Sequence, residues 1–278
     1  MTPATPRAAA TVAVIRQGQP GAGSPFEVML LRRSATMTFV AGAHVFPGGS
    51  LDEADVLADA PACCDGLDAP PRFPHLDRAG EIACSVAAAR ELVEEAGVLL
   101  ARRQGRFATG EEAEAVRRAL DEGVSFEQAL RDGGFRLALD ALVPFAQIVT
   151  PRSEPRRFDT HFFLAELPAG AVARPAAAES DELLWATPAG ALRGGLGGEI
   201  VLLPPTWLTL MQLEPLDSVA DALAWGRGRS IDRLEPSLTE QAGERRLSVP
   251  TAGGAVRFSF EDGRGWRPVG RPLPVPPG

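Results

Sequence analysis

The chain has 278 residues, a length that fits one large domain with elaborations or a domain with a helical appendage. Its formal net charge of −8 at pH 7 argues against a nonspecific nucleic-acid-binding surface. The sequence contains no apolar run long enough to span a membrane, and its first residues lack the basic and then apolar plan of a signal peptide. We therefore expect a cytoplasmic protein with no nucleic-acid partner and no membrane partner.

Two features of the composition limit the chemistry. The chain contains no Lys, so a direct contact with a phosphate must come from Arg, His or a backbone amide. The acidic balance does not exclude a phosphate substrate, because bound cations and nearby arginines can reverse the local field. Cys63, Cys64 and Cys84 form no Cys-x-x-Cys pair, which favours reduced, structural cysteines over a zinc site.

The predicted elements start with two β-rich runs, residues 11–16 and 26–33, whose Gly- and Pro-rich connection indicates a hairpin. Residues 56 to about 76 are rich in Asp, Ala and Pro and are interpreted as an irregular insertion. Asp77 is then the expected N-cap of a helix that runs to Ala96.

The rest of the chain alternates between strands and helices. The remaining strands are expected near residues 98–101, 141–149, 158–167, 183–186 and 255–260. The remaining helices are expected at residues 111–121 and 126–131, briefly after Thr187-Pro188, and at residues 206–213 and 218–225. This order favours a mixed sheet with helices on both faces.

The most informative segment is the acidic run from residue 90 to residue 98. At 3.6 residues per turn, Glu91, Glu94 and Glu95 lie on one face of the predicted helix, where like charges repel one another. Arg90 can neutralise one of them, and hard divalent cations such as Mg²⁺ bind clustered carboxylate oxygens. The alternative is a solvated acidic helix face with no ligand.

An upstream glycine turn favours the metal-binding interpretation. The residues Phe46-Pro47-Gly48-Gly49 can bring backbone against the carboxylates. Together the two segments resemble the Nudix signature, in which a glycine and five residues precede an acid, and a later Arg-Glu-apolar-x-Glu-Glu-x-Gly-apolar run forms the catalytic helix. The later run matches at every fixed position, and Gly49 matches the leading glycine.

The acid of the signature is displaced. Asp55 stands where the family normally has Glu, and 34 residues separate it from Arg90 in place of the family's short spacer. Glu81 is the alternative, but eight residues separate it from Arg90, one more than the family spacing. We expect Asp55 to be the acid, with the additional residues looped out between the glycine turn and the helix.

The resemblance implies an α/β fold, a Nudix-type α/β/α sandwich with a mixed β-sheet over residues 9–195. The insertion at about 56–76 and extra helices at about 110–132 elaborate this domain. A helical C-terminal extension, residues 196–265, is expected to pack on it, and residues 266–278 to form a disordered tail.

The resemblance also implies a reaction. Nudix hydrolases generally hydrolyse a nucleoside diphosphate linked to another group and use Mg²⁺ or Mn²⁺. Carried over by position, Glu91, Glu94 and Glu95 are metal ligands or bases, with the choice of base left open. The carbonyl of Gly48 is a further metal ligand, and Arg90 orients the glutamates by ion pairing. These five residues form the expected catalytic and metal-binding set.

A more distant acid often completes such sites. Glu179 resembles the acid that precedes the Trp-bearing strand of the family, here the strand of Trp185. We include Glu179 among the candidate catalytic residues, with an exposed loop carboxylate as the alternative.

The substrate is inferred from the residues that flank the glycine turn. Residues 29–34, Thr38, Gly42 and residues 46–49 have the spacing of the coenzyme A element of CoA-diphosphatase Nudix proteins, with Leu31 and Thr38 in place of the usual Thr and Arg. The candidate substrate-binding residues are Arg32, Arg33, Gly42, Phe46 and Gly49, with Arg156 and Arg157 as substitutes for the missing arginine.

The interrupted signature resembles the peroxisomal acyl-CoA diphosphatases and their bacterial relatives, although the chain does not end in a Ser-Lys-Leu-type address. We expect a hydrolase that cleaves CoA or acyl-CoA to 3′,5′-ADP and (acyl-)4′-phosphopantetheine. The alternatives are an ADP-ribose or NADH pyrophosphatase and a catalytically silent nucleotide-sensing module. The expected partner is a small-molecule nucleotide, and a homodimer is left open.

Overall fold

The computed structural model describes residues 3–18, 25–34, 41–176, 180–241 and 243–270. The helical segments are η1 (Glu53–Asp55), α1 (Ala60–Cys63), α2 (Arg78–Ala96), α3 (Gly110–Asp121), α4 (Phe126–Asp132), η2 (Leu139–Ala141), α5 (Pro188–Gly197), α6 (Pro204–Leu213) and α7 (Val219–Gly228). The strands of the central sheet are β1 (Arg7–Gln17), β2 (Phe26–Arg33), β3 (Ala43–Val45), β4 (Gly48–Ser50), β9 (Val143–Val149), β10 (Phe158–Glu166), β11 (Ser180–Ala186), β12 (Val201–Leu202) and β13 (Arg233–Leu234).

Two smaller sheets complete the fold. One contains β5 (Cys64–Asp65), β6 (Ala101–Arg103), β7 (Arg106–Phe107) and β8 (Arg136–Ala138). The other contains β14 (Ser237–Gln241), β15 (Glu244–Thr251), β16 (Gly254–Glu261) and β17 (Gly265–Pro268). Within the described residues, no helix combines the length and the apolar composition needed to cross a membrane.

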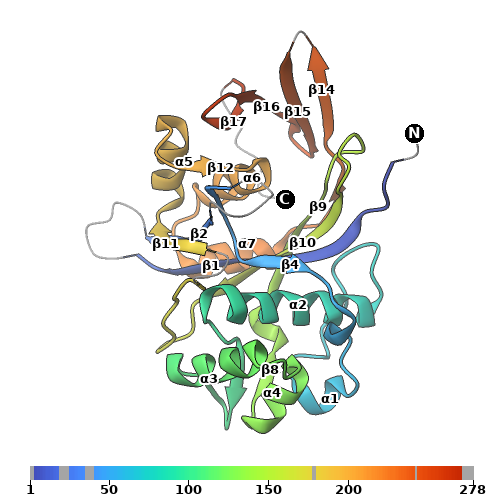
Figure 1. Ribbon diagram of the computed structural model, residues 1–278, viewed down its shortest axis with the longest axis vertical. Coiled ribbons are helices and arrows are strands. Elements are labelled where there is room, and N and C mark those ends of the chain that lie inside the picture. Colours follow the sequence, from blue (N-terminus) through green and yellow to red (C-terminus); the bar gives the residue numbers. More distant parts are fainter. Residues whose placement is uncertain (1–2, 19–24, 35–40, 177–179, 242, 271–278) are drawn as a thin grey trace.

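The central sheet is mixed, as predicted. Strand β1 runs parallel to β10 and antiparallel to β2, and the predicted hairpin is confirmed by the pairing of Ile15 with Val28. The long β10 also pairs antiparallel with β9, which places the 141–149 and 158–167 runs side by side. Figure 1 shows these strands crossing the middle of the molecule.

The sheet branches at β1. Strand β2 pairs with β1 only over Ile15–Gln17, whereas β4 pairs with β1 further along, where Thr11 meets Gly48. Beyond its contact with β1, β2 pairs with β3, and β3 pairs with β12. The two residues Phe46 and Pro47 therefore cross from one branch of the sheet to the other, immediately before the glycine turn.

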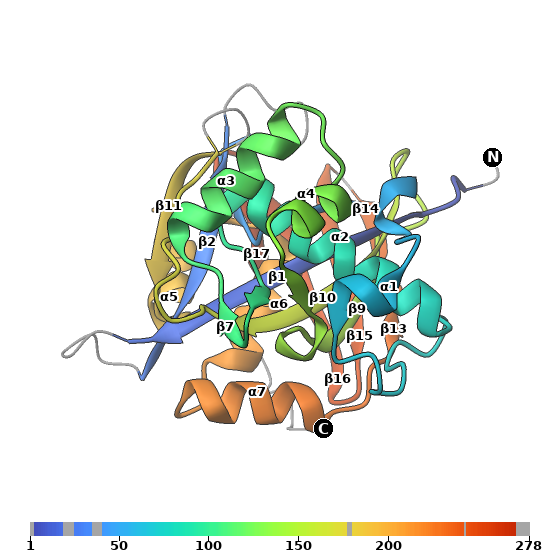
Figure 2. The same cartoon turned by 90° about the horizontal axis from the view of Figure 1, so that it is seen from below.

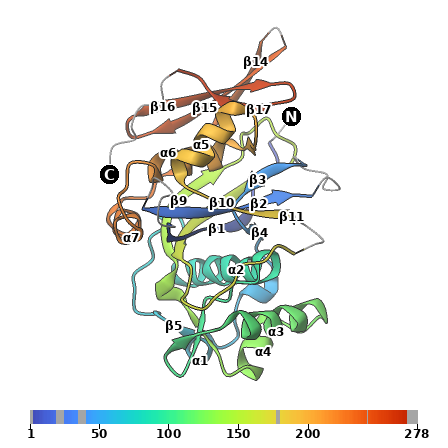
Figure 3. The ribbon, with the colours of Figure 1, turned by 90° about the vertical axis from the view of Figure 1, so that its left-hand side faces the viewer.

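Helices cover both faces of the central sheet, which confirms the predicted sandwich. Alternate residues of a strand point to opposite faces, and in β1 Val12 and Val14 pack with α2 while Ala13 and Ile15 pack with α6 and α7. The additional helices α3 and α4 lie on the side of α2 away from the sheet (Figures 2 and 3). Each face of the sheet thus has its own apolar core.

Helix α2 has the predicted ends. The Asp77 side chain accepts a hydrogen bond from the Gly80 amide at 2.8 Å, which caps the first turn. Gly97 ends the helix at φ 64°, a conformation that costs glycine little. The apolar side chains of Leu92 and Val93 are fully buried, so the helix is held against the sheet by its apolar side.

The insertion between residues 56 and 76 is packed against the domain. It contains α1 and β5, and Phe73 near its end is 1% exposed in the core beside α2. The guanidinium of Arg72 donates to the carbonyl oxygens of Gly226, at 3.0 Å, and Arg229. The insertion is thereby tied to the end of α7, far along the chain.

The C-terminal extension contains more β-structure than predicted. Helices α6 and α7 match the two expected helices, but a four-stranded antiparallel sheet follows in the described residues, where only the strand at 255–260 was expected. Alternating apolar residues explain it, because Leu247 and Val249 of β15 and Val256 and Phe258 of β16 are all buried. Strand β17 extends into the first residues of the expected tail, and residues 271–278 lie outside the described residues.

Candidate active site

Arg90 is the centre of the site. Its guanidinium, on a residue only 9% exposed, forms two parallel hydrogen bonds with Asp55: Nε to Oδ1 at 2.8 Å and Nη2 to Oδ2 at 3.0 Å. Such a bidentate pair is the strongest arrangement available to an arginine and a carboxylate. Asp55, and not Glu81, is therefore the acid that meets Arg90 across the 34-residue separation.

Local structure places each of the two acids. Asp55 lies in the η1 turn, where its Oδ2 also accepts a hydrogen bond from the Asp52 amide at 2.8 Å. Glu81 accepts hydrogen bonds from the amides of Arg72, at 2.5 Å, and Phe73, at 2.9 Å. Glu81 thus anchors the end of the insertion to α2, which is a structural role.

Two of the helix glutamates share one nitrogen of Arg90. The Nη1 atom donates to Glu91 Oε1 at 2.9 Å and to Glu94 Oε2 at 2.7 Å. Burial opposes the charge on Arg90, but the hydrogen bonds to Asp55 and the nearby carboxylates of Glu91 and Glu94 outweigh it and raise the pKa of the guanidinium. The predicted repulsion between the carboxylates is therefore relieved by a permanently charged partner.

The glycine turn meets the third glutamate. The Gly48 amide donates to Glu95 Oε2 at 2.9 Å. A Cβ atom at Gly48 would lie 2.6 Å from Thr11 Cβ, and one at Gly49 would lie 2.6 Å from Glu91 Cδ. Only glycine permits this close approach of β4 to β1 and to α2.

The donor chemistry of this site fits a hard divalent cation. Glu91, Glu94 and Glu95 supply carboxylate oxygens from one helix face, and the backbone of Gly48 lies against the same face. Among the residues that the structure describes, no three His, Cys, Asp or Glu side chains converge as metal ligands. Glu91 and Glu94 accept hydrogen bonds from Arg90, while Glu95 accepts one from the Gly48 amide.

Arg32 and Arg33 lie at the end of β2, whose neighbour β3 leads into the glycine turn. Arg32 is half-buried and pairs with Asp181 at 2.7 Å and Glu182 at 3.3 Å. The hydrogen bond with Asp181 and its charge raise the pKa of Arg32. The Gly42 amide donates to the Arg33 carbonyl at 3.0 Å, which closes the loop whose middle, including Thr38, lies outside the described residues.

Two other candidate substrate-binding residues are held by packing or hydrogen bonds within the protein. Phe46 is 5% exposed within the core on the face opposite α2. Arg157 is 7% exposed and donates to the carbonyls of Thr150, at 3.0 Å, and Ala4, at 2.8 Å, and to Glu235 at 2.8 Å. A substrate contact by Arg157 requires these bonds to break, whereas Arg156 is exposed.

Glu179 lies outside the described residues, so its predicted role stays a prediction. The strand that follows it is described: β11 pairs with β2, and Trp185 lies under the guanidinium of Arg16, whose carbon is 4.1 Å from the ring centroid.

One cavity of the molecule was not predicted from the sequence. A cavity of about 520 Å³ lies between the central sheet, α6 and the C-terminal sheet. Its lining comes from segments as far apart as residues 148–162, 201–208 and 236–266. Because these segments share no local motif, only their meeting in three dimensions reveals the cavity.

Known proteins resemble the chain over most of its length. It is 30% identical to the acyl-coenzyme A diphosphatase NUDT19 of Gallus gallus over 82% of this chain and 73% of the relative, and 32% identical to NUDT19 of Homo sapiens over 78% and 68%. The solved structure of a Nudix hydrolase from Alicyclobacillus acidocaldarius superposes with a TM-score of 0.65, at 30% identity, over 79% of this chain and 96% of that one. No family model matches the chain.

These similarities agree with the site geometry. The bidentate Asp55–Arg90 pair, the glutamates of α2 and the close approach of Gly48 and Gly49 supply the parts of the interrupted signature. The sandwich around them is the fold of the solved relative. The chain belongs to the Nudix hydrolase family and is a hydrolase of phosphoric anhydride bonds.

Proposed function

We propose that the protein is a Mg²⁺- or Mn²⁺-dependent diphosphatase that cleaves CoA or acyl-CoA to 3′,5′-ADP and (acyl-)4′-phosphopantetheine. The row of Glu91, Glu94 and Glu95 against the glycine turn carries this proposal. Two further observations support the choice of substrate: the coenzyme A element at residues 29–49, and the relatives named acyl-coenzyme A diphosphatase.

The protein's own groups have definable tasks in this reaction. Glu91, Glu94 and Glu95 would hold the cation, with the Gly48 carbonyl as a further ligand. The chemistry that such a cation supplies when bound is charge neutralisation on the diphosphate and activation of a water molecule. Arg90 fixes the orientation of Glu91 and Glu94, and Asp55 in turn fixes Arg90. Any of the three glutamates can serve as the base in this arrangement.

Recognition of the nucleotide is assigned to the rim of the site. Arg32 and Arg33 lie at the end of β2, beside the loop closed by Gly42. An arginine is well suited to a phosphate group because its donors form a fixed fork. Arg156, which is exposed, is the further candidate for such a contact, and Glu179 is proposed to complete the acidic site.

A product analysis tests the proposal. The purified protein is incubated with CoA, acetyl-CoA, ADP-ribose and NADH in the presence of Mg²⁺ or Mn²⁺, and products are identified by mass spectrometry. We expect 3′,5′-ADP and the matching 4′-phosphopantetheine from the two CoA compounds. Turnover of ADP-ribose or NADH with CoA untouched would overturn the substrate while leaving the reaction class intact.

The second candidate is an ADP-ribose or dinucleotide pyrophosphatase. Leu31 and Thr38 replace two residues of the usual coenzyme A element, and the lost arginine is a natural partner for the 3′-phosphate. The silent nucleotide-sensing module ranks below both enzymes, because the chain keeps all three helix glutamates. A cytoplasmic location, a homodimer and the domain limits 9–195 and 196–265 belong to the proposal as well.

A further inference from the structure

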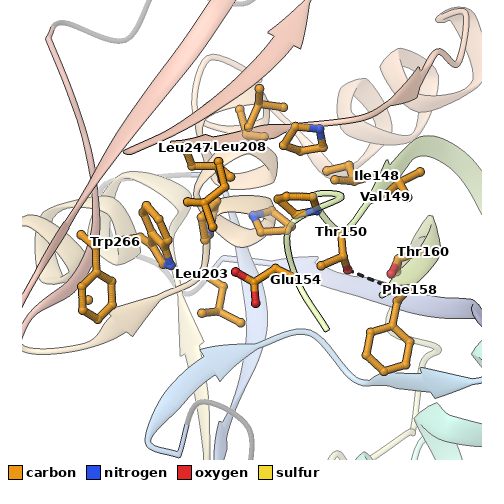
Figure 4. Close-up of a pocket in the computed structure, with 18 of the residues that line it drawn as sticks. Ile148, Val149, Thr150, Glu154, Phe158, Thr160, Leu203, Leu208, Leu247 and Trp266 are labelled. Atoms are coloured by element: carbon orange, nitrogen blue, oxygen red, sulfur yellow. Dashed lines mark hydrogen bonds between the residues drawn. The ribbon is translucent and has the colours of Figure 1, made fainter. Parts of the chain in front are cut away.

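The cavity between the central sheet, α6 and the C-terminal sheet has three structural parts. Thr160 of β10 lies on its floor, Leu203 and Leu208 around the start of α6 form one wall, and Leu247 and Trp266 of the C-terminal sheet form its roof (Figure 4). Phe162, which follows Thr160 on the same face of β10, also lines the cavity. Its volume of about 520 Å³ falls in the range of about 300–1,000 Å³ that small-molecule sites occupy. The C-terminal extension is thus required to close it.

The lining is unsuited to a nucleotide. Among the described lining residues the charged side chains are Glu154 and Arg245, and they form an ion pair at 3.1 Å. Thr150 already accepts a hydrogen bond from the Phe158 amide at 3.0 Å, drawn in Figure 4. A base or phosphate needs unsatisfied donors and acceptors, and most of this lining is aliphatic, aromatic or proline. The cavity therefore fits an apolar occupant.

The register of the sheet places the cavity close to the glycine turn. Phe162 on the floor pairs with Thr11 in β1, and Thr11 pairs with Gly48 in β4. Two strand spacings of about 4.8 Å put Gly48 about 10 Å from the floor. The wall belongs to the other branch of the sheet, since Val201 of β12 pairs with Ala43 of β3.

The glycine turn therefore connects the strand that supports the wall of the cavity with the strand that borders its floor. Phe46 and Pro47 connect β3, which supports the wall, with β4, which borders the floor strands through β1. An extended pantetheine arm is longer than two strand spacings. The cavity lies on the face of the sheet opposite α2, so the arm of a diphosphate held at Gly48 and Gly49 reaches it by passing around β4. Among the described strands β4 pairs with β1 alone, which leaves its other edge open to this passage.

We propose that this cavity binds the acyl chain of an acyl-CoA substrate, an assignment that rests on the proposed diphosphatase function. It gives the C-terminal sheet a task that the reaction itself does not need. The chain would displace water from apolar walls, and each buried CH₂ group contributes about fourfold to a binding constant. The value of kcat/KM is then expected to rise with acyl length until the cavity is full.

The test compares chain-length preference in the wild type and in variants that fill the cavity. Leu203→Trp places a larger side chain on the wall and Thr160→Phe places a larger one on the floor, so each variant has a smaller cavity. For each protein, kcat/KM is measured with CoA, hexanoyl-CoA and dodecanoyl-CoA, and the ratio of the dodecanoyl-CoA value to the CoA value is formed. In the wild type we expect a ratio above 10, and in both filled variants a ratio at least tenfold lower.

A matched control distinguishes the effect of filling the cavity from a general loss of structure. Leu216 is half-buried in the same extension but does not line the cavity, so Leu216→Trp is expected to keep the wild-type ratio. Circular dichroism melting confirms that each variant is folded, and the two filled positions lie on different elements, so the failure of one to fold leaves the other. A ratio unchanged in the folded filled variants would overturn the assignment.

A second measurement separates the assignment from the proposed function. If the wild type hydrolyses neither CoA nor acyl-CoA, the proposed function fails. Binding of dodecanoate, measured by titration calorimetry, then tests whether the cavity takes an apolar chain. Binding to the wild type and to Leu216→Trp, with at least tenfold weaker binding to the filled variants, supports an apolar-chain site. Equal binding to all of them, or none to the wild type, refutes it.

Discussion

At the scale of single residues, Arg90 explains how a row of carboxylates is tolerated on one face of the largely buried helix α2. One guanidinium contacts Asp55, Glu91 and Glu94, and its remaining donor reaches the Ser50 carbonyl at 3.2 Å. A lysine ammonium has three donors around a point and cannot present this planar fork. The ion pairs thus position the glutamates and link α2 to η1, and the hydrogen bond to Ser50 links α2 to β4.

The first prediction concerns Glu95. Glu95→Gln keeps the volume and an oxygen that can accept from the Gly48 amide, but it removes the charge needed for a cation. We expect a loss of at least about 100-fold in kcat, in the range seen when a key electrostatic group is removed, with the melting temperature nearly unchanged. Glu111→Gln, which alters an exposed carboxylate on α3, is the control.

Steady-state rates with CoA and a melting curve for each protein provide the measurement. A Glu95→Gln variant with near-wild-type activity would remove Glu95 from the metal site. A large fall in melting temperature would instead show that the carboxylate is needed for folding.

The second prediction concerns pH. His161 is 2% exposed, its Nδ1 lies 3.1 Å from the Ala9 carbonyl oxygen, and its ring meets Phe73 edge to face. Burial lowers the pKa of His161 below the ordinary value of 6.5. Below pH 6.5 the unfolded chain therefore binds a proton that the folded chain does not, so stability falls as pH decreases toward the lowered pKa.

Denaturant unfolding at pH 7, 6 and 5 measures this dependence. His161→Gln keeps a neutral donor for the Ala9 carbonyl, so its free energy of unfolding is expected to fall less steeply than that of the wild type. His75→Gln, which removes an exposed histidine, serves as the control. Equal slopes for His161→Gln and the wild type would contradict the prediction.

At the scale of elements, the insertion links α2 and α7, which pack on opposite faces of the central sheet. Glu81 of α2 holds the amides of Arg72 and Phe73, and the Arg72 side chain holds the carbonyls of Gly226 and Arg229. The insertion therefore joins the start of α2 to the end of α7. The insertion separates the glycine turn from α2 in the sequence, yet the two lie next to each other in space.

The third prediction tests the link that the insertion forms with α7. Arg72→Met keeps the apolar stem but leaves the two carbonyls at the end of α7 without their donor, at a cost of about 1–3 kcal/mol in the free energy of unfolding. Hydrogen exchange is expected to quicken in residues 66–76 and at the end of α7. Arg118→Met, on an exposed arginine of α3, should show neither change. Unaltered exchange in Arg72→Met would mean that the insertion is held by its apolar contacts alone.

At the scale of the whole molecule, polar ties hold the C-terminal region against the hydrolase core. Arg157 connects the first described residues, through the Ala4 carbonyl, with the end of β9, through Thr150, and with Glu235 before β14. The Glu154–Arg245 pair makes a second tie at the rim of the cavity. The sheet that roofs the cavity is therefore fixed to the strands that form its floor.

The fourth prediction uses two neighbouring arginines. Arg157→Met leaves the Thr150 and Ala4 carbonyls and the Glu235 carboxylate without their donor and is expected to lower the free energy of unfolding by about 1–3 kcal/mol. Arg156→Met, at an exposed position, should change it by no more than about 0.5 kcal/mol. Urea unfolding of both variants gives the comparison, and equal stabilities would show that Arg157 does not hold the two regions together.

The sequence by itself determined the local features of this protein. The limits of α2 follow from Asp77 and Gly97, because capping and left-handed termination depend only on neighbouring residues. The glutamate face follows in the same way from helical spacing. The alternating apolar residues of β15 also carried a strand signal, although the extension was expected to be helical.

Only the tertiary structure decided which distant parts meet. Asp55 meets Arg90 across 34 residues, while Glu81 of the same helix as Arg90 accepts hydrogen bonds from the end of the insertion. Arg157, a candidate for substrate binding from its charge, is surrounded by three protein partners. The cavity arises where two branches of the sheet and the C-terminal strands meet, and no single segment encodes such a space, because its walls are contacts between residues far apart in the chain.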